Sequence, residues 1–230
     1  MSGPASRIPK TGTVVAIDGP AGVGKSTLAR WLAEVLRLAY VNTGVMYRSV
    51  AHEALRRGID AADGAEVAAL AGAIEFSLDE AATPPVLLVN GRPPQEAALA
   101  HGDVEEIVSS VAAHPAVREV LREAQRRLGV AGAVVEGRDI GTVVFPDADV
   151  KIFLQADPIE RATRRQTERG SVDPALAKAL EKRDERDSRV NPLAPASDSV
   201  LVDTSGRSPD EVLAEVKGII ERALEDGSSR

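Results

Sequence analysis

The chain has 230 residues, of which 43 % are hydrophobic and 27 % are charged, so it has the composition of a folded globular domain and not of a disordered chain. It contains no cysteine, which excludes disulfide scaffolds, thiolate metal sites, thiol nucleophiles and iron–sulfur clusters. The formal net charge of −7 argues against general nucleic-acid binding, because that binding depends on neutralising phosphates.

Short apolar runs alternate with stretches of helical periodicity along the chain. A helix is predicted over 25–38, with Leu28, Leu32 and Leu36 on one stripe. Because the apolar runs are separated by helices, they predict βαβ units and a parallel sheet covered on both faces, which is an α/β fold. The predicted strands cover 13–17, 39–41, 86–89, 133–136, 150–154 and 199–202.

Two segments interrupt this core. The region 62–112 contains the turn signal Asn90-Gly91, which predicts a hairpin between the run at 86–89 and the residues that follow. The segment 157–173 begins with the helix cap Asp157-Pro158 and contains a glycine break that a hinge would need. A further helix is predicted to start at the capping box of Ser208 and Glu211. We expect flexible tails at 1–11 and 226–230.

A phosphate-binding loop follows the first predicted strand. Its glycines allow backbone N–H groups to turn inward around a phosphate, and the following helix N-terminus adds a favourable dipole. Lys25 can reach the terminal phosphates, and the Ser26 hydroxyl can bind Mg²⁺. A glycine-rich turn with a chance lysine is the alternative, which the strand before and the helix after disfavour. The predicted nucleoside triphosphate site comprises Gly19, Pro20, Ala21, Gly22, Val23, Gly24, Lys25, Ser26 and Thr27.

Arginines late in the chain favour a kinase over other phosphate-loop proteins. Arg161, Arg165 and Arg169 are spaced to share one helix face, with Arg164 beside them. Either they form a solvated basic face, or they belong to a mobile lid that closes over transferring phosphates and excludes water. The chain has no Asn-Lys-x-Asp guanine-recognition motif, which weighs against a switch GTPase.

A second polar motif, Glu136-Gly137-Arg138-Asp139, directly follows a predicted strand. Ligands of parallel sheets bind at the carboxyl ends of strands, so these side chains are candidates for a substrate site. There Arg138 can hold an acceptor phosphate, Asp139 can accept a hydrogen bond from a base amino group, and Glu136 can hold Mg²⁺ through water. A turn with a local ion pair is the alternative interpretation.

Taken together, these motifs resemble the bacterial cytidylate kinase family of nucleoside monophosphate kinases. The resemblance covers nearly the whole chain in the family's order, and its most specific part is the run from Glu136 to Ala148. The other matching stretches are 17–27, Thr43-Gly44 with Tyr47-Arg48, 117–119, 150–154, Arg183-Asp184 with Asp187-Ser188, and 191–193.

The resemblance implies a phosphate-loop NTPase fold in one domain over 1–230, with a five-stranded parallel sheet. It also implies that the region at about 62–112 binds the monophosphate and that the segment at about 157–173 is a helical lid. The implied reaction transfers the γ-phosphoryl group of ATP, with Mg²⁺, to CMP or dCMP. The implied lid residues are Arg161, Arg164 and Arg165; the acceptor phosphate would bind Arg48, Arg138 and Arg189; the sugar would contact Thr43, Arg183 and Asp187; and cytosine would contact Ser109, Arg118 and Asp139.

This chain departs from the family pattern in two places. The tract after Asp187 is shorter than usual, so Arg186 is an alternative to Arg189 at the phosphate, and an arginine common near Ala100 is missing. We expect direct in-line transfer without a covalent intermediate, with Lys25, Arg138, Arg161 and Arg165 as the catalytic residues.

Two other classes of function stay open at the sequence level. A related kinase could use UMP, AMP or another small acceptor, and a regulatory or RNA-assembly NTPase would hydrolyse ATP without one. No apolar run approaches the roughly 18 residues of a membrane span, and residues 1–10 lack the apolar stretch of a signal peptide. We therefore expect a cytoplasmic protein that binds small molecules and neither membranes nor nucleic acid. We expect a monomer because the sequence leaves no obvious exposed apolar stripe.

Overall fold

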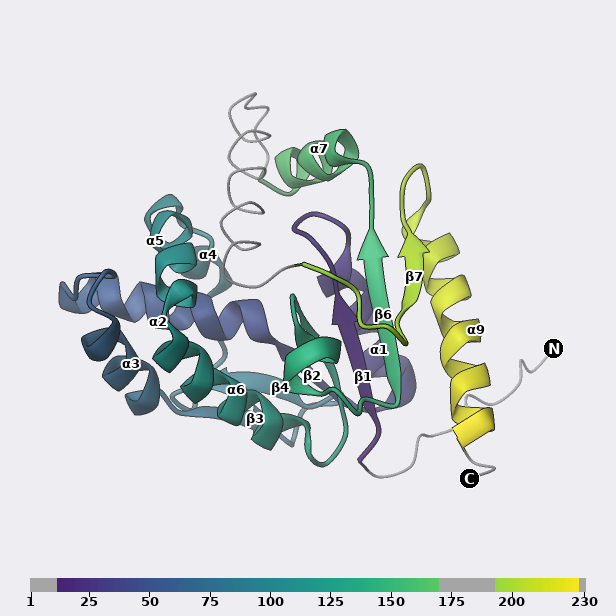
Figure 1. Cartoon of the computed structure of the whole chain (residues 1–230), viewed down its shortest axis with the longest axis horizontal. Coiled ribbons are helices and arrows are strands. Elements are labelled where there is room, and N and C mark those ends of the chain that lie inside the picture. Colours follow the sequence, from purple (N-terminus) through teal and green to yellow (C-terminus); the bar gives the residue numbers. More distant parts are fainter. Residues whose placement is uncertain (1–11, 170–192, 228–230) are drawn as a thin grey trace.

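A computed structural model describes residues 12–169 and 193–227, and Figure 1 shows a central twisted sheet with helices on both sides. The strands are β1 (Val14–Asp18), β2 (Ala39–Asn42), β3 (Phe76–Asp79), β4 (Val86–Val89), β5 (Ala133–Gly137), β6 (Val150–Gln155) and β7 (Val200–Asp203). The helices are α1 (Lys25–Leu36), α2 (Thr43–Arg57), α3 (Gly64–Ala73), α4 (Glu96–Leu99), α5 (Gly102–Ala113), α6 (Pro115–Gly129), α7 (Pro158–Arg169) and α9 (Pro209–Gly227), with a π-helical turn, η1, at Ile140–Val144.

The sheet has seven strands in the order β3-β4-β2-β5-β1-β6-β7, and not the five that the resemblance implied. Every neighbouring pair is parallel except β3 and β4, so the expected α/β class with a parallel core is confirmed. The extra strands come from the inserted region. Its hairpin joins the edge of the core sheet through Tyr40 and Val86, and the Tyr40 N–H donates to the Pro85 carbonyl at 2.9 Å.

The hairpin forms upstream of the position that the turn signal predicted. Asn90 and Gly91 do adopt positive φ angles of 51° and 71°, but only one bridge, between Val89 and Arg92, follows them. Pro93 and Pro94 come next, and proline cannot supply the N–H groups that a longer ladder requires. Strand β4 therefore pairs with β3, which precedes it.

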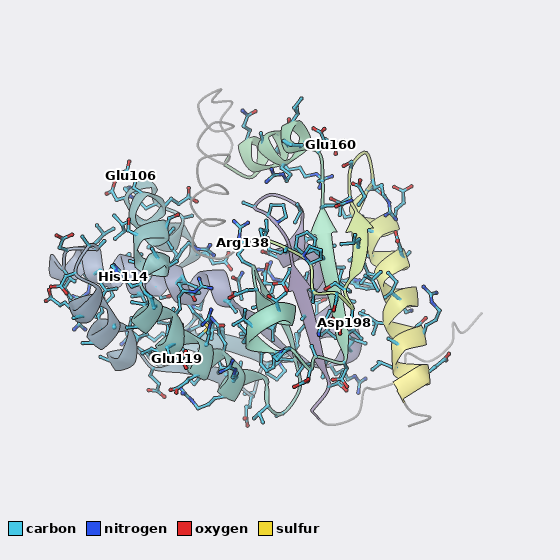
Figure 2. All side chains as sticks on the ribbon, viewed as in Figure 1. Glu106, His114, Glu119, Arg138, Glu160 and Asp198 are labelled. Carbon is cyan, nitrogen blue, oxygen red and sulfur yellow. The ribbon has the colours of Figure 1, made fainter. Side chains whose placement is uncertain are left out.

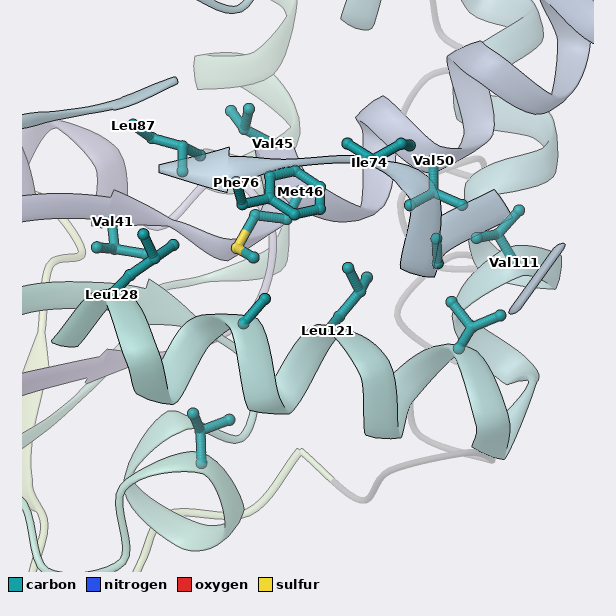
Figure 3. Close-up of a cluster of buried hydrophobic side chains, with 14 of the residues drawn as sticks. Val41, Val45, Met46, Val50, Ile74, Phe76, Leu87, Val111, Leu121 and Leu128 are labelled. Carbon is teal, nitrogen blue, oxygen red and sulfur yellow. The ribbon is translucent and has the colours of Figure 1, made fainter. Parts of the chain in front are cut away.

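Side chains of the strands alternate between two hydrophobic cores. Val15 and Ile17 of β1 face a core that α1 and α9 complete, whereas Val14 and Ala16 face a core completed by α2, α3, α5 and α6. Figure 3 shows part of the second core, where Leu121 and Leu128 of α6 project towards the sheet. Both leucines are nearly or fully buried. This burial fixes the helices that carry the polar residues at the carboxyl edge of the sheet.

Helix boundaries follow their capping residues. Helix α1 ends at Leu36, two residues before the predicted end, because Arg37 adopts a left-handed conformation (φ 55°) and turns Leu38 into the core. The predicted capping box is confirmed: the Ser208 N–H donates to Glu211 Oε2 at 2.8 Å, and the Glu211 N–H donates to Ser208 Oγ at 3.3 Å. Helix α9 continues to Gly227, two residues into the segment predicted as a tail.

An ion pair anchors the chain that leads into β7. The Lys151 ammonium group, on β6, contacts both carboxylate oxygens of Asp198 at 2.8 and 2.9 Å and also donates to the Pro146 carbonyl. Lys151 is buried, and Asp198 lies below the strand tips in Figure 2.

Among the described residues, no helix combines the length and apolar character that would be needed to cross a bilayer.

Candidate active site

The phosphate-binding loop connects the carboxyl end of β1 to the first turn of α1. Gly19, Gly22 and Gly24 all have positive φ, at 147°, 77° and 90°. Such angles suit glycine and turn successive peptide groups inward. The Lys25 ammonium group folds back over the loop and donates to the Pro20 carbonyl at 2.7 Å. The predicted loop therefore has the strand, turn and helix that a phosphate site requires.

Two of these glycines are also required because other backbone lies against them. A Cβ atom at Gly19 would be 2.3 Å from the Leu154 carbonyl oxygen, at the end of β6. A Cβ atom at Gly22 would be 2.7 Å from the Arg161 carbonyl oxygen, in α7. The phosphate loop is thus packed directly against the end of β6 and against α7, the helix that follows β6 in the chain.

Glu136, at the end of β5, is the centre of a buried hydrogen-bond network. Its Oε1 accepts from the Tyr40 hydroxyl at 2.5 Å, and its Oε2 accepts from Ser26 Oγ at 2.9 Å. The Thr43 hydroxyl donates to its carbonyl oxygen at 2.7 Å, and Asn42 Nδ2 donates to the Tyr40 hydroxyl at 3.2 Å. Burial first, and then the neighbouring Glu136, raises the pKa of Tyr40, so its hydroxyl stays protonated as the donor.

The pair formed by Ser26 and Glu136 fits a divalent cation chemically. Hydroxyl and carboxylate oxygens are the ligands that Mg²⁺ prefers, and Mg²⁺ usually binds one or two protein groups together with substrate phosphates. Ser26 is exposed at the loop while Glu136 is only 3 % exposed, and the 2.9 Å hydrogen bond between them holds the hydroxyl and the carboxylate together.

Asp18 joins the phosphate loop to the turn that follows β5. Its Oδ1 accepts from the Ile140 N–H and its Oδ2 from the Gly141 N–H, both at 2.8 Å. In return Arg138 Nη1 contacts the Gly19 carbonyl at 3.4 Å. Burial raises the pKa of Asp18 to about 6, although the two N–H donors oppose that rise. The residues at 138–141 are therefore fixed against the loop by reciprocal contacts.

Asp139 stands at the start of the π-helical turn and faces helix α6. Its Oδ2 accepts from Arg118 Nη2 at 2.6 Å, and Arg122 Nη2 lies 3.4 Å from the same oxygen. The ring of Tyr47 lies nearby, and burial raises the pKa of its hydroxyl to about 12, so it stays neutral. The position two residues before Asp139 must be a glycine, because a Cβ atom at Gly137 would be 2.7 Å from the Thr43 hydroxyl oxygen.

One cleft of about 540 Å³ connects the phosphate loop to the acceptor side. Its lining brings together most of the residues that the sequence nominated, from elements far apart in the chain. They are Ala21, Gly22, Gly24, Lys25, Ser26, Thr27, Thr43, Arg48, Ser109, Arg118, Glu136, Arg138 and Asp139. Figure 2 shows Arg138 near the middle of the molecule.

Two arginines of α7 whose side chains the structure describes, Arg161 and Arg164, contact groups around the phosphate loop, and neither belongs to the lining of this cleft. Arg161 Nη1 donates to the Ala21 carbonyl at 3.2 Å. Arg164 donates to the Thr204 hydroxyl at 2.9 Å and to its carbonyl at 2.6 Å, and also contacts Glu160 at 3.2 Å. Arg164 is therefore bound to the loop after β7. In Figure 1, α7 lies beyond the carboxyl ends of β6 and β7.

Some of the predicted residues lie outside the part of the chain that the structure describes. This applies to Arg183, Asp187 and Arg189, to the alternative Arg186, to 170–173 of the predicted lid, to all of the expected tail 1–11 and to 228–230 of the other tail. For Arg165 the structure describes the backbone, within α7, but not the side chain.

Sequence reasoning missed several residues of the site. The pattern around Tyr40 and Asn42 predicts only a strand, so it does not nominate either residue for the site. The one signal for a role of Tyr40 is that aromatic residues make up only 3 % of the chain. Asp18 and Arg122 were overlooked because their partners become neighbours only in the fold. Arg30 also lines the cleft and lies 3.6 Å from Glu96 of α4.

Comparisons with known proteins agree on one family. A sequence profile of the family described as Cytidylate kinase matches residues 15–222. A cytidylate kinase of Desulfitobacterium hafniense (strain Y51) is 42 % identical over 94 % of this chain and 96 % of its own. A cytidylate kinase of Rhodococcus jostii (strain RHA1) is 46 % identical over 87 % of this chain and 91 % of its own.

A solved structure of a gluconokinase from Sinorhizobium meliloti 1021 is similar over 96 % of both chains, with a TM-score of 0.42 and 17 % identity. A likeness of that size is too low to support a statement about activity.

Proposed function

Because the chain belongs to the cytidylate kinase family, we propose that it transfers the γ-phosphoryl group of ATP to CMP or dCMP, giving ADP with CDP or dCDP. The observation that carries this proposal is the shared cleft. It joins the phosphate loop to Ser109, Arg118 and Asp139, so that two nucleotides can meet with their phosphates between the two groups.

We assign the donor side to the phosphate loop. Its inward peptide groups and Lys25 bind and neutralise the donor phosphates, and the α1 N-terminus adds its dipole. Ser26 and Glu136 would hold Mg²⁺, which supplies charge neutralisation at the phosphates when bound. The proposed lid is the segment 157–173, and Arg161 and Arg165 would move over the phosphates when it closes. Such a closure would exclude water that would otherwise hydrolyse ATP.

We assign the acceptor side to the opposite wall. Arg48 and Arg138 line the cleft and would hold the acceptor phosphate, with Arg189 or Arg186 as a further contact. Thr43, Arg183 and Asp187 would contact the sugar. The acceptor phosphate is already anionic near neutral pH, so positioning and charge neutralisation carry the transfer and a general base is unnecessary.

We assign recognition of the acceptor base to Asp139, Arg118 and Ser109. Cytosine presents an amino donor where uracil presents a carbonyl oxygen, and a carboxylate accepts only from the former. A uracil nucleotide would set acceptor against acceptor, which costs about 1–3 kcal/mol and corresponds to roughly 5- to 150-fold discrimination. Arg118 and Ser109 would donate to the other edge of cytosine. The inserted region 62–112, which supplies Ser109, would thus be the monophosphate-binding region.

The remaining proposals concern the cellular compartment, the area of metabolism and the oligomeric state. We propose a cytoplasmic enzyme of pyrimidine nucleotide metabolism that acts as a monomer, which size-exclusion chromatography with light scattering would test. The acidic net charge of −7 supports small-molecule substrates over nucleic acid.

The deciding experiment measures ADP release from ATP and Mg²⁺ with no acceptor and with CMP, dCMP, UMP or AMP. The proposal expects fast release with the cytidine nucleotides, slower release with UMP and AMP, and almost none without an acceptor. ATP hydrolysis that is equally fast without a monophosphate would instead favour a regulatory NTPase. Failure of CMP to bind at millimolar concentration in calorimetry would also refute the proposal.

A further inference from the structure

We propose that Arg122 is a positioning residue that holds the carboxylate of Asp139 in the orientation that reads the acceptor base, and so increases selectivity for cytosine over uracil. The inference rests on the proposed function, because it concerns base selection in the same reaction.

The first observation is the geometry of the donors. Both arginines lie on α6, one turn apart, and both direct an Nη2 atom at Asp139 Oδ2, Arg118 from 2.6 Å and Arg122 from 3.4 Å. Two cations at this spacing repel each other on a helix, and a carboxylate between them reverses the sign of the interaction. The arrangement therefore depends on the Asp139 carboxylate facing α6.

The second observation is that the two carboxylate oxygens have different surroundings. Within the described residues, no hydrogen bond or ion pair involves Asp139 Oδ1, whereas Oδ2 receives both arginines. The main chain that follows is fixed as well, since Ile140 and Gly141 donate to Asp18. With Oδ2 and the backbone both held, Oδ1 is the oxygen left to accept from the amino group of cytosine.

The third observation separates the roles of the two arginines. Arg118 lines the cleft, so it is the guanidinium that can also donate to the base. Arg122 is not part of the cleft lining, and its side chain is 22 % exposed. When Arg118 shares its N–H groups with a base, Arg122 remains to hold Oδ2. Arg122 thus acts through Asp139 and does not contact the substrate.

A fourth observation indicates that Arg122 is placed for this contact. Its Nε is buried and has no hydrogen-bond partner among the described residues. Among the described residues, Asp139 is the only hydrogen-bond or ion-pair partner of Arg122, so the guanidinium is directed at this one carboxylate. The contact with Asp139 is the interaction that this placement provides.

The test compares kcat/KM for CMP and for UMP in the wild-type protein and in Arg122→Ala, with Arg122→Lys as the conservative variant. Arg127→Ala is the matched control, since Arg127 is an exposed arginine of the same helix. Arg122→Met, which keeps an unbranched aliphatic stem, replaces the alanine variant if that variant does not fold. Thermal unfolding is measured for every protein.

We expect Arg122→Ala to narrow the CMP:UMP ratio about three- to tenfold, through a higher KM for CMP, with kcat and the KM for ATP within twofold of wild type. Arg122→Lys should recover part of the ratio, and Arg127→Ala should leave it unchanged. Equal losses on CMP and UMP, or an unchanged ratio, would overturn the inference while leaving the proposed function intact. A wild-type protein that does not use CMP would overturn the proposed function itself.

Discussion

Replacing Asp18 with asparagine should change how the stability of the protein depends on pH. Asp18 is 6 % exposed, and burial raises its pKa in the folded state from 3.8 to about 6. The folded state therefore binds this proton more tightly than the unfolded chain does. Asp18 contributes stability that is complete below about pH 3.8 and is lost as the pH rises through 6.

The size of the effect follows from the two pKa values. Between pH 4.5 and pH 7 the folded state loses about 2 kcal/mol of its stability through this single group, because each pKa unit is worth about 1.4 kcal/mol. Asparagine cannot ionise, so Asp18→Asn lacks this loss. It also loses an acceptor for either the Ile140 or the Gly141 N–H, but that cost is the same at both pH values and cancels in the comparison.

The assay is urea unfolding followed by circular dichroism at pH 4.5 and pH 7. We expect the stability difference between wild type and Asp18→Asn to move by about 2 kcal/mol in favour of the variant at the higher pH. Asp210→Asn, which removes an exposed carboxylate in α9, measures the general effect of losing one negative charge. Equal differences at the two pH values for Asp18→Asn would refute the reasoning.

Three further predictions concern the phosphate loop and the network around Glu136, and Gly72→Ala is the control for the third. Lys25→Ala should lower turnover at least about a hundredfold in the ADP-release assay with an unchanged circular dichroism spectrum, and a variant within tenfold of wild type would contradict the role of Lys25. Tyr40→Phe should leave Glu136 Oε1 without its donor and lower the free energy of unfolding by about 1–3 kcal/mol in urea titration; an unchanged midpoint would argue against the network. Gly19→Ala should weaken ATP binding in calorimetry and destabilise the fold, because its Cβ would be 2.3 Å from the Leu154 carbonyl oxygen. Gly72, in helix α3, has open space around it, so Gly72→Ala should raise the free energy of unfolding by about 0.5–1 kcal/mol. ATP binding by Gly19→Ala as tight as that of wild type would show that the loop tolerates the extra atom.

The sequence predicted those parts of the fold whose signals are local. The phosphate loop, the cap of α7 at Asp157 and the capping box of α9 are each written in fewer than ten consecutive residues, and the structure has all three. The number of strands was wrong because the attachment of the hairpin depends on a single pairing, between Tyr40 and Val86, that no local pattern records. The position of the hairpin was wrong because the turn signal at Asn90 is real but the prolines after it prevent a ladder.

The candidate site divides in the same way. Residues that sit in a motif, such as Lys25 and Asp139, could be nominated because the motif itself implies their chemistry. Asp18 and Arg122 could not, since an aspartate at the end of a strand and an arginine on an amphipathic helix are ordinary until the fold supplies their partners. Long-range hydrogen bonds between side chains and distant backbone leave no periodicity in the sequence.

Tyr40 takes part in two attachments at once, one through its main chain and one through its hydroxyl. Its main chain pairs with Val86 and so joins the inserted hairpin to the sheet. Its hydroxyl donates to the carboxylate of Glu136, beside the phosphate loop. The attachment of the hairpin and the placement of the Glu136 carboxylate therefore depend on the same residue, so a substitution that displaces the main chain of Tyr40 would disturb both.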